Sequence, residues 1–193
     1  MEDEKKQKKI MKYISTRGNA PILNFEEALL TGLASDGGLY LPVSWPKINT
    51  SEIPKGKYWE KATFLMLPFV GDFLNEQELL RLTKRAYSHF PSDDAAPLRK
   101  LKNNKFLLEL YHGPTLAFKD FAMLILAELF EAALEKKGKK ITILGATSGD
   151  TGSAAIEAFK NSNHADVFIL FPKGRVSETQ RRQMTTVSSK SVY

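Results

Sequence analysis

The sequence predicts an α/β protein in which a mostly helical first region precedes a domain built on a parallel sheet. Beyond residue 105, short apolar runs alternate with helical segments, which is the pattern of a parallel sheet with helices on its faces. Before residue 91, helix-start signals recur and strand-like runs are short. A polar segment bounded by Pro91 and Pro97 is interpreted as a linker between the two regions, because proline and small polar residues are typical of linkers.

Length and composition narrow the class of protein. The 193 residues suffice for one full domain or for one domain with a small extra unit. A hydrophobic share of 42% and a charged share of 26% are typical of a folded chain. The absence of cysteine excludes disulfides, thiolate catalysis and cysteine zinc sites. The histidines lack metal-ligand spacing, so no metal site is predicted; they are His89, His112 and His164.

Charge and hydropathy argue against nucleic-acid and membrane partners. The net charge of +6 comes from scattered lysines and arginines, without a basic run interleaved with aromatic residues. No stretch reaches the roughly 18 apolar residues that span a bilayer. Residues 1–12 mix acidic residues with lysines and have no apolar centre, so we expect a flexible tail, no signal peptide and a cytoplasmic location.

Two capping boxes organise the first region, residues 13–97. Asn24 with Glu27, and Asn75 with Glu78, each place a capping side chain three residues before a glutamate. The predicted elements are a helix from Asn24 to about Leu33, a short strand Leu39–Leu41, a helix Lys57–Val70 and a helix from Asn75 to about Ser88.

The second region, residues 98–193, is predicted to hold three parallel strands and the helices between them. The expected strands are Phe106–Leu110, Lys140–Leu144 and Asp166–Phe171, and the expected helices are Asp120–Lys137, Ser153–Lys160 and Ser177–Met184. The first of these helices is apolar almost all round, so it should be buried. A further strand is expected to begin near Ser191, which makes this region the first part of a larger domain.

A single lysine is the most informative residue. Lys119 lies where the strand-like stretch and its following turn give way to the apolar helix, between Phe118 and Phe121. The positive end of a helix disfavours a second cation. A lysine that must be neutral to attack a carbonyl benefits from such a position, whereas an ordinary surface lysine gains nothing. Asp120 is expected to help cap the helix, with a weaker case for a counter-ion role.

A glycine-containing turn is the second candidate site. Residues 145–155 follow a predicted strand and open a helix, and free amides at a helix start bind carboxylate or phosphate. The spacing from Gly145 to Gly149 is one residue short for a phosphate-binding P-loop, and no Gly-Lys-Ser/Thr follows. A tight turn that merely needs glycine explains the segment equally well.

Other candidates carry less weight. His112 is close to Lys119 in sequence and could line the same site, while His164 reads as a turn residue. Lys173 and Arg175 follow the third predicted strand, so they could meet an anionic substrate, although solvated loop charges are at least as common a reading.

Five blocks in order resemble threonine synthases, which are pyridoxal-phosphate (PLP) enzymes of the tryptophan-synthase-β group, fold type II. The blocks are Tyr13–Gly18, Gly32–Pro42, His112–Phe121, Ser148–Ala155 and Phe171–Ser177. The resemblance implies a three-layer, parallel-sheet PLP domain, here incomplete. It also implies conversion of O-phospho-L-homoserine and water to L-threonine and phosphate by a carbon–oxygen lyase.

The resemblance also assigns roles by position. Lys119 corresponds to the Schiff-base lysine and later general base, Phe118 would lie against the cofactor, and Asp150 would lie near its phenolic oxygen. The segment that would grip the substrate carboxylate is Ser148, Gly149, Asp150, Thr151 and Gly152. Candidates for binding the substrate phosphate are Lys173, Arg175 and Arg17.

Threonine synthases are much longer than this chain, and their second half supplies the rest of the cofactor site. We therefore expect an N-terminal portion with little activity of its own. Two other readings stay open: a non-catalytic remnant that binds a metabolite or partner, and a PLP-dependent lyase for another phosphorylated amino acid. The sequence leaves the oligomeric state open.

Overall fold

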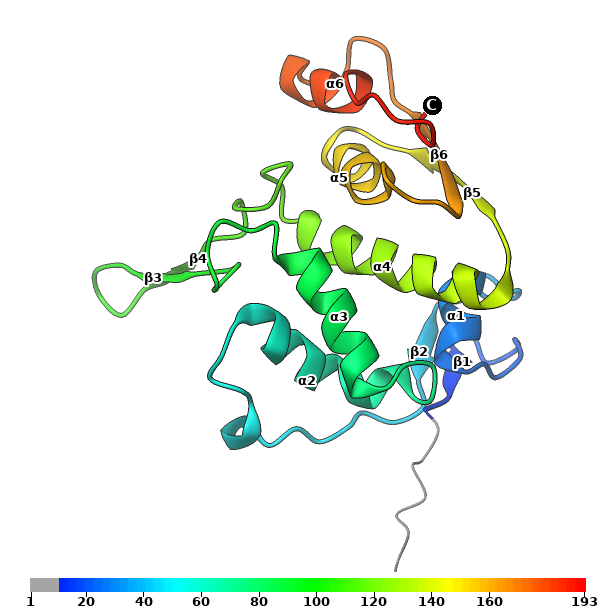
Figure 1. Ribbon diagram of the computed structural model, residues 1–193, viewed down its shortest axis with the longest axis vertical. Helices are drawn as coiled ribbons and strands as arrows, with labels where there is room; N and C mark the ends of the chain where they lie inside the picture. Colours follow the sequence, from blue (N-terminus) through cyan, green and yellow to red (C-terminus); the bar gives the residue numbers. More distant parts are fainter. Residues whose placement is uncertain (1–10) are drawn as a thin grey trace, which may run out of the picture. The chain divides into compact units, whose positions relative to one another are not determined.

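The computed structural model describes residues 11–193, so most of the tail expected over residues 1–12 lies outside the described residues. The chain divides into two compact units. Figure 1 labels their helices and strands. Of the described residues, the first unit holds 11–56 and 60–81, and the second holds 57–59 and 82–193. Within this described range, no helix has both the length and the apolar character needed to cross a membrane.

The first unit combines a small antiparallel sheet with short helices. Strand β1 (Tyr13–Ser15) pairs with β2 (Tyr40–Pro42) in a register that sets Ile14 opposite Leu41. Helix α1 (Phe25–Thr31) follows the predicted capping box, and a 3₁₀ turn η1 (Thr50–Glu52) comes later. The Asn24 side chain accepts from the Glu27 amide, and the Glu27 carboxylate accepts from the Asn24 amide, both at 2.9 Å.

The second capping box is also confirmed. The Asn75 amide donates to the Glu78 carboxylate at 2.8 Å, and the Glu78 amide donates to the Asn75 side chain at 2.9 Å. Helix α3 (Glu76–Tyr87) starts directly after Asn75 and contains Glu78, and α2 (Tyr58–Val70) matches the predicted helix within one residue.

The second unit carries most of the predicted alternation. Its elements are β3 (Leu98–Lys100), β4 (Phe106–Leu108), α4 (Asp120–Lys137), β5 (Ile141–Ala146), α5 (Asp150–Phe159), β6 (Ala165–Leu170) and α6 (Glu178–Thr185). Helix α4 ends at Gly138, as expected, in the left-handed conformation that glycine favours.

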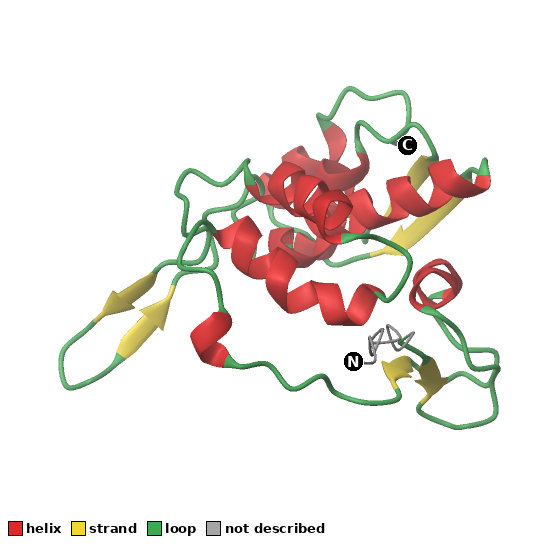
Figure 2. Ribbon diagram, turned by 60° about the horizontal axis from the view of Figure 1, so that its bottom comes forward, coloured by secondary structure: helices red, strands yellow, loops and turns green. Residues whose placement is uncertain are grey.

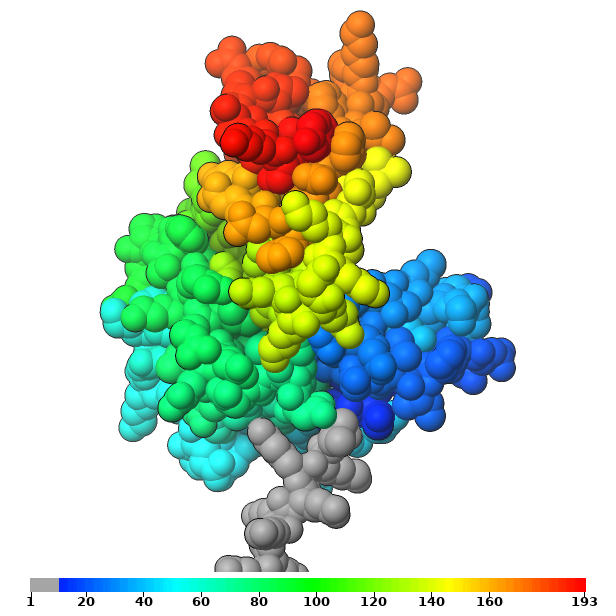
Figure 3. Space-filling model, turned by 45° about the vertical axis from the view of Figure 1, so that its right-hand side comes forward, coloured from blue at the N-terminus to red at the C-terminus, as the bar shows by residue number. Residues whose placement is uncertain are grey.

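A parallel pair of strands organises this unit. β5 and β6 run parallel with Ile143 opposite Val167, and Val192 makes a further parallel bridge to Val167, where the next strand was expected to begin. The core beside them contains Ile156, Phe159 and Met184. The yellow, orange and red residues from β5 onward form one packed body in Figure 3.

The predicted role of the segment Phe106–Leu110 is wrong. Residues Phe106–Leu108 do form a strand, but it pairs antiparallel with β3 in a separate hairpin, shown in Figure 2, rather than joining a three-stranded parallel sheet. The cause is local: Asn103 and Asn104 both adopt positive φ, 58° and 53°. Paired positive-φ residues are typical of tight β-hairpin turns.

Replacing Asn75 by alanine should destabilise the chain by about 1 kcal/mol, because one helix-start amide loses its acceptor. Asn75→Ser keeps an acceptor and should cost less. Urea unfolding followed by circular dichroism measures both; equal stability of Asn75→Ala and the parent chain would contradict the capping role.

Candidate functional site

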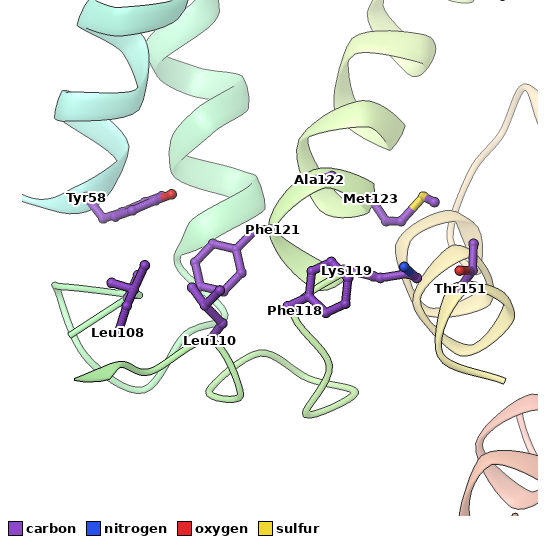
Figure 4. A pocket seen from close by; sticks show the side chains of 10 residues that line it. Tyr58, Leu108, Leu110, Phe118, Lys119, Phe121, Ala122, Met123 and Thr151 are labelled. Carbon is purple, nitrogen blue, oxygen red and sulfur yellow. The ribbon is translucent and has the colours of Figure 1, made fainter. Parts of the chain in front are cut away.

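Lys119 lies at the start of α4, as predicted. It is the N-cap residue, it makes no side-chain capping bond, and its side chain borders a cavity of about 740 Å³. Figure 4 shows this side chain directed toward Thr151, at the start of α5. The cavity is largely apolar and is lined by Tyr58, Ala96, Leu108, Leu110, Phe118, Lys119, Phe121, Ala122, Met123 and Thr151.

The turn before Lys119 is held by a buried carboxylate. Asp120 is fully buried, and its carboxylate accepts from the Thr115 amide at 2.9 Å and from the Thr115 hydroxyl at 2.6 Å. Burial raises the pKa of Asp120 above its ordinary value, and the two bonds from Thr115 partly oppose that rise. Asp120 thus ties the turn to the helix start, in place of the predicted cap on the helix amides.

Close packing fixes the same turn. A side chain at Gly113 would begin 2.3 Å from an Asp120 carboxylate oxygen, so only glycine fits there. Leu116 adopts a positive φ of 62°, which is uncommon for a residue with a side chain. The backbone leading to Phe118 and Lys119 is therefore set by tight contacts.

The surroundings of the Lys119 amine are mostly apolar. Its nitrogen lies 4.3 Å from the ring centroid of Phe118. Across residues 11–193, no carboxylate lies within ion-pair distance of this nitrogen. The dipole of α4 adds partial positive charge at its first turn. This environment suits an amine that reacts with an electrophile or binds an anion.

The glycine-containing turn is more compact than predicted, because α5 begins at Asp150 and takes in residues expected in the loop. The Thr147 hydroxyl accepts from the amides of Gly149, at 3.1 Å, and Gly152, at 3.0 Å. Gly149 has a φ of 147°, which residues with side chains avoid. The first-turn amides of Asp150 and Thr151 have no intrahelical acceptor, so they remain available to a ligand.

The structure brings some of the predicted residues together. Lys119, Phe118 and Thr151 line one cavity. Ser148 and Gly149 in the adjoining turn, and Asp150 and Gly152 in the first turn of α5, do not line it. The Asp150 carboxylate accepts from the side-chain amide of Gln180 on α6 at 2.6 Å. Sequence reasoning missed Gln180, although its capping box with Ser177 is a readable signal.

His112 does not border the cavity. Its Nε2 lies 2.8 Å from a carboxylate oxygen of Glu109, and this bond holds the pKa of Glu109 below its ordinary value. His164 pairs with Glu131 at 2.6 Å. Over residues 11–193, no three histidine, aspartate or glutamate side chains gather where they could hold a metal ion.

The proposed phosphate-binding residues are not gathered at the cavity. Lys173 and Arg175 are exposed in the segment between β6 and α6, and they do not line it. Arg17 belongs to the first unit, where its guanidinium donates to the Asp36 carbonyl at 2.8 Å.

Fold and site together define a class of protein: an α/β unit in which a lysine and the start of helix α5 border one apolar cavity. Comparison with known proteins narrows this class. Residues 12–87 match the family described as threonine synthase N terminus. Threonine synthase of Pseudomonas aeruginosa is 50% identical over 95% of this chain, and threonine synthase-like 2 of Rattus norvegicus is 43% identical over 95%.

A solved structure agrees. PLP-bound threonine synthase from Brucella melitensis superposes with a TM-score of 0.90 at 49% identity, covering 95% of this chain. The chain spans only 40% of that protein and 40% of the Pseudomonas protein. In sequence and in fold, this chain therefore matches the N-terminal portion of threonine synthases.

Changing Asp120 to asparagine should destabilise the second unit by about 1–3 kcal/mol, because an amide cannot accept both Thr115 bonds and its NH₂ would face a donor. Asp72→Asn, at an exposed carboxylate, should change stability by less than about 0.5 kcal/mol. Urea unfolding compares the two variants. Equal effects would show that the buried carboxylate does not hold the turn.

Glu178 at the start of α6 should titrate far below the ordinary pKa of a glutamate. Hydrogen bonds from Arg181 and Arg182 lower its pKa from 4.5 to about 2. A depressed carboxylate stabilises the folded state above its unfolded pKa, and that contribution is lost as pH falls through the folded pKa. We therefore expect α6 to loosen between about pH 4.5 and about pH 2. Carbon-detected NMR of the Glu178 carboxyl measures this; titration near 4.5 would contradict it.

Proposed function

We propose that this chain supplies the lysine-bearing part of a PLP-dependent threonine synthase. The reaction converts O-phospho-L-homoserine and water to L-threonine and phosphate, the last step of threonine biosynthesis. The observation that carries the proposal is the position of Lys119, at the start of α4 and bordering an apolar cavity. The names of the similar proteins support it.

The residues at the cavity fit PLP. A volume of about 740 Å³ lies within the usual range for small-molecule and cofactor sites. Lys119 offers the amine that binds the cofactor's aldehyde, and Phe118 offers an aromatic face beside it. Asp150 does not line the cavity itself, but it precedes the lining residue Thr151 and would lie near the phenolic oxygen. When bound, PLP supplies an electron sink for carbanions at the substrate.

The chain's own residues would then bind and orient the substrate. The free amides of Asp150 and Thr151, with the hydroxyls of Ser148 and Thr151, suit a carboxylate at a helix start. Lys119 Nζ lies on the same cavity, so it can move protons at the substrate carbons as a general base. The apolar lining would keep bulk water away from the reacting atoms.

The larger framework follows from the same proposal. Residues 13–97 would form the N-terminal domain of a threonine synthase, and residues 98–193 the first part of a fold type II PLP domain. Because the chain spans 40% of its relatives, we propose that it turns over little substrate alone. A cytoplasmic location stays a prediction, as does the lack of nucleic-acid and membrane partners.

A second candidate is a PLP-dependent lyase for another phosphorylated amino acid. The observation that favours it is the 43% identity to threonine synthase-like 2 of Rattus norvegicus, whose name sets it apart from threonine synthase itself.

Mixing the chain with PLP, reducing with borohydride and mapping peptides should place the label on Lys119. The cavity lysine is preorganised there, whereas exposed lysines are not. Lys119→Arg should remove the label from this peptide and leave weak background elsewhere. Labelling spread evenly over many lysines would show that these residues do not assemble a cofactor site.

Adding, as a separate polypeptide, the portion of the Pseudomonas threonine synthase that this chain does not cover tests which substrate is converted. We expect phosphate release and threonine from O-phosphohomoserine, abolished by Lys119→Ala. Phosphate release with a product other than threonine would favour the second candidate. No release from any phosphorylated amino acid, with Lys119 labelled, would favour a binding protein without catalysis.

A further inference from the structure

Helix α6 sends two side-chain amides to the two turns that form the candidate site. Gln180 donates to the Asp150 carboxylate at 2.6 Å, and Gln183 donates to the Thr115 carbonyl at 3.0 Å. We infer that α6 is a brace that holds the lysine-bearing turn, residues 113–119, and the glycine-containing turn, residues 147–152, in a fixed relation. Gln180 and Gln183 are then positioning residues for Lys119, and this role rests on the proposed function.

The orientation of the Gln180 amide is fixed from both ends. Its oxygen accepts from the amide of Ser177 at 3.2 Å and from the Ser177 hydroxyl at 3.0 Å, which completes the capping box of α6. Only its NH₂ is left to face the glycine-containing turn. A side chain at Gly149 would begin 2.4 Å from this amide, so Gln180 packs directly on that turn.

Gln183 approaches the other turn from outside. Residues three apart share a helix face, so Gln183 projects from the side of α6 that carries Gln180. Its target residue, Thr115, is already held from within, because its amide and hydroxyl both donate to Asp120. Thr115 thus connects the buried carboxylate next to Lys119 with α6.

Packing keeps α6 in place between these bonds. Met184 is buried, and its sulfur lies 2.9 Å from where a side chain at Gly152 would begin. α6 therefore rests on the first turn of α5, the helix whose Thr151 shares the cavity with Lys119. A shift of α6 would act on both turns together.

The test uses the full chain with glutamate isosteres. Gln180→Glu keeps the capping box, since glutamate serves that role as well as glutamine, but replaces the donor to Asp150 by a like charge. Gln183→Glu likewise removes the donor to the Thr115 carbonyl. Thr179→Ala changes an exposed residue of the same helix and is the matched control.

Amide hydrogen exchange measures how firmly α6 holds the two turns, and the measurement needs no cofactor. The reporters are the amides of Thr115 and Leu116 in one turn, and of Gly149 and Gly152 in the other, all hydrogen-bonded in the structure. Each glutamate variant should speed exchange about fivefold at both turns, as expected for loss of one hydrogen bond. Thr179→Ala should leave both turns unchanged.

A swap gives the rescue. Gln180→Glu with Asp150→Asn exchanges donor and acceptor across the same pair, so protection of both turns should return. Faster exchange confined to the turn next to the mutated glutamine, or no rescue by the swap, would overturn the brace. If a variant with one substitution unfolds, exchange in the swap variant still tests whether the Gln180–Asp150 bond protects both turns.

Pyridoxal labelling then separates the brace from the proposed function. In the parent chain, label on Lys119 supports the function; its absence counts against the function and leaves the exchange result intact. With the parent labelled, the glutamate variants should shift label from Lys119 to other lysines at a temperature well below the thermal midpoint of every variant. Unchanged selectivity for Lys119 would show that the brace does not position it.

Discussion

The buried carboxylate of Asp120 is the constraint on which the candidate site depends. A buried charge is costly unless it is hydrogen-bonded, and Thr115 provides both bonds from the turn five residues earlier. Because Asp120 directly follows Lys119, satisfying this carboxylate also fixes where the lysine leaves the backbone. The requirement that Gly113 have no side chain follows from the same packing.

The starts of helices α4 and α5 both border the cavity, and the dipoles of both helices place partial positive charge there. The first turns of α4 and α5 each present partial positive charge, and Lys119 adds an amine between apolar walls. Under the proposed function, an anionic group would be attracted by the two helix starts and the amine, and the carboxylates of Asp120 and Asp150 in the same two turns would oppose that attraction in part. The proposed substrate carries a carboxylate and a phosphate, so its charge complements the site. The positive ends of the two helices would not stabilise a lysine whose only role is to be a charged surface residue.

Local signals made much of the fold predictable. The capping pairs Asn24–Glu27 and Asn75–Glu78, and the stop at Gly138, act within a few residues, so the sequence shows them directly. The position of Lys119 at a helix start was predictable because an apolar run follows it. The pairing partner of β4 was not predicted, since it is decided by two asparagines that adopt positive φ. The reach of Gln183 to Thr115 spans 68 residues, and no local pattern reveals such a contact.

The same contrast explains how the site is assembled. The lysine-bearing turn and the glycine-containing turn are each shaped by their own residues, through Asp120 and Thr147 respectively. Their mutual position has to come from elsewhere, because neither set of bonds crosses from one turn to the other. Packing of α4 on α5 supplies the coarse spacing, and side chains of α6 reach both turns. Local sequence thus builds the two halves of the candidate site, and tertiary contacts set the distance between Lys119 and the start of α5.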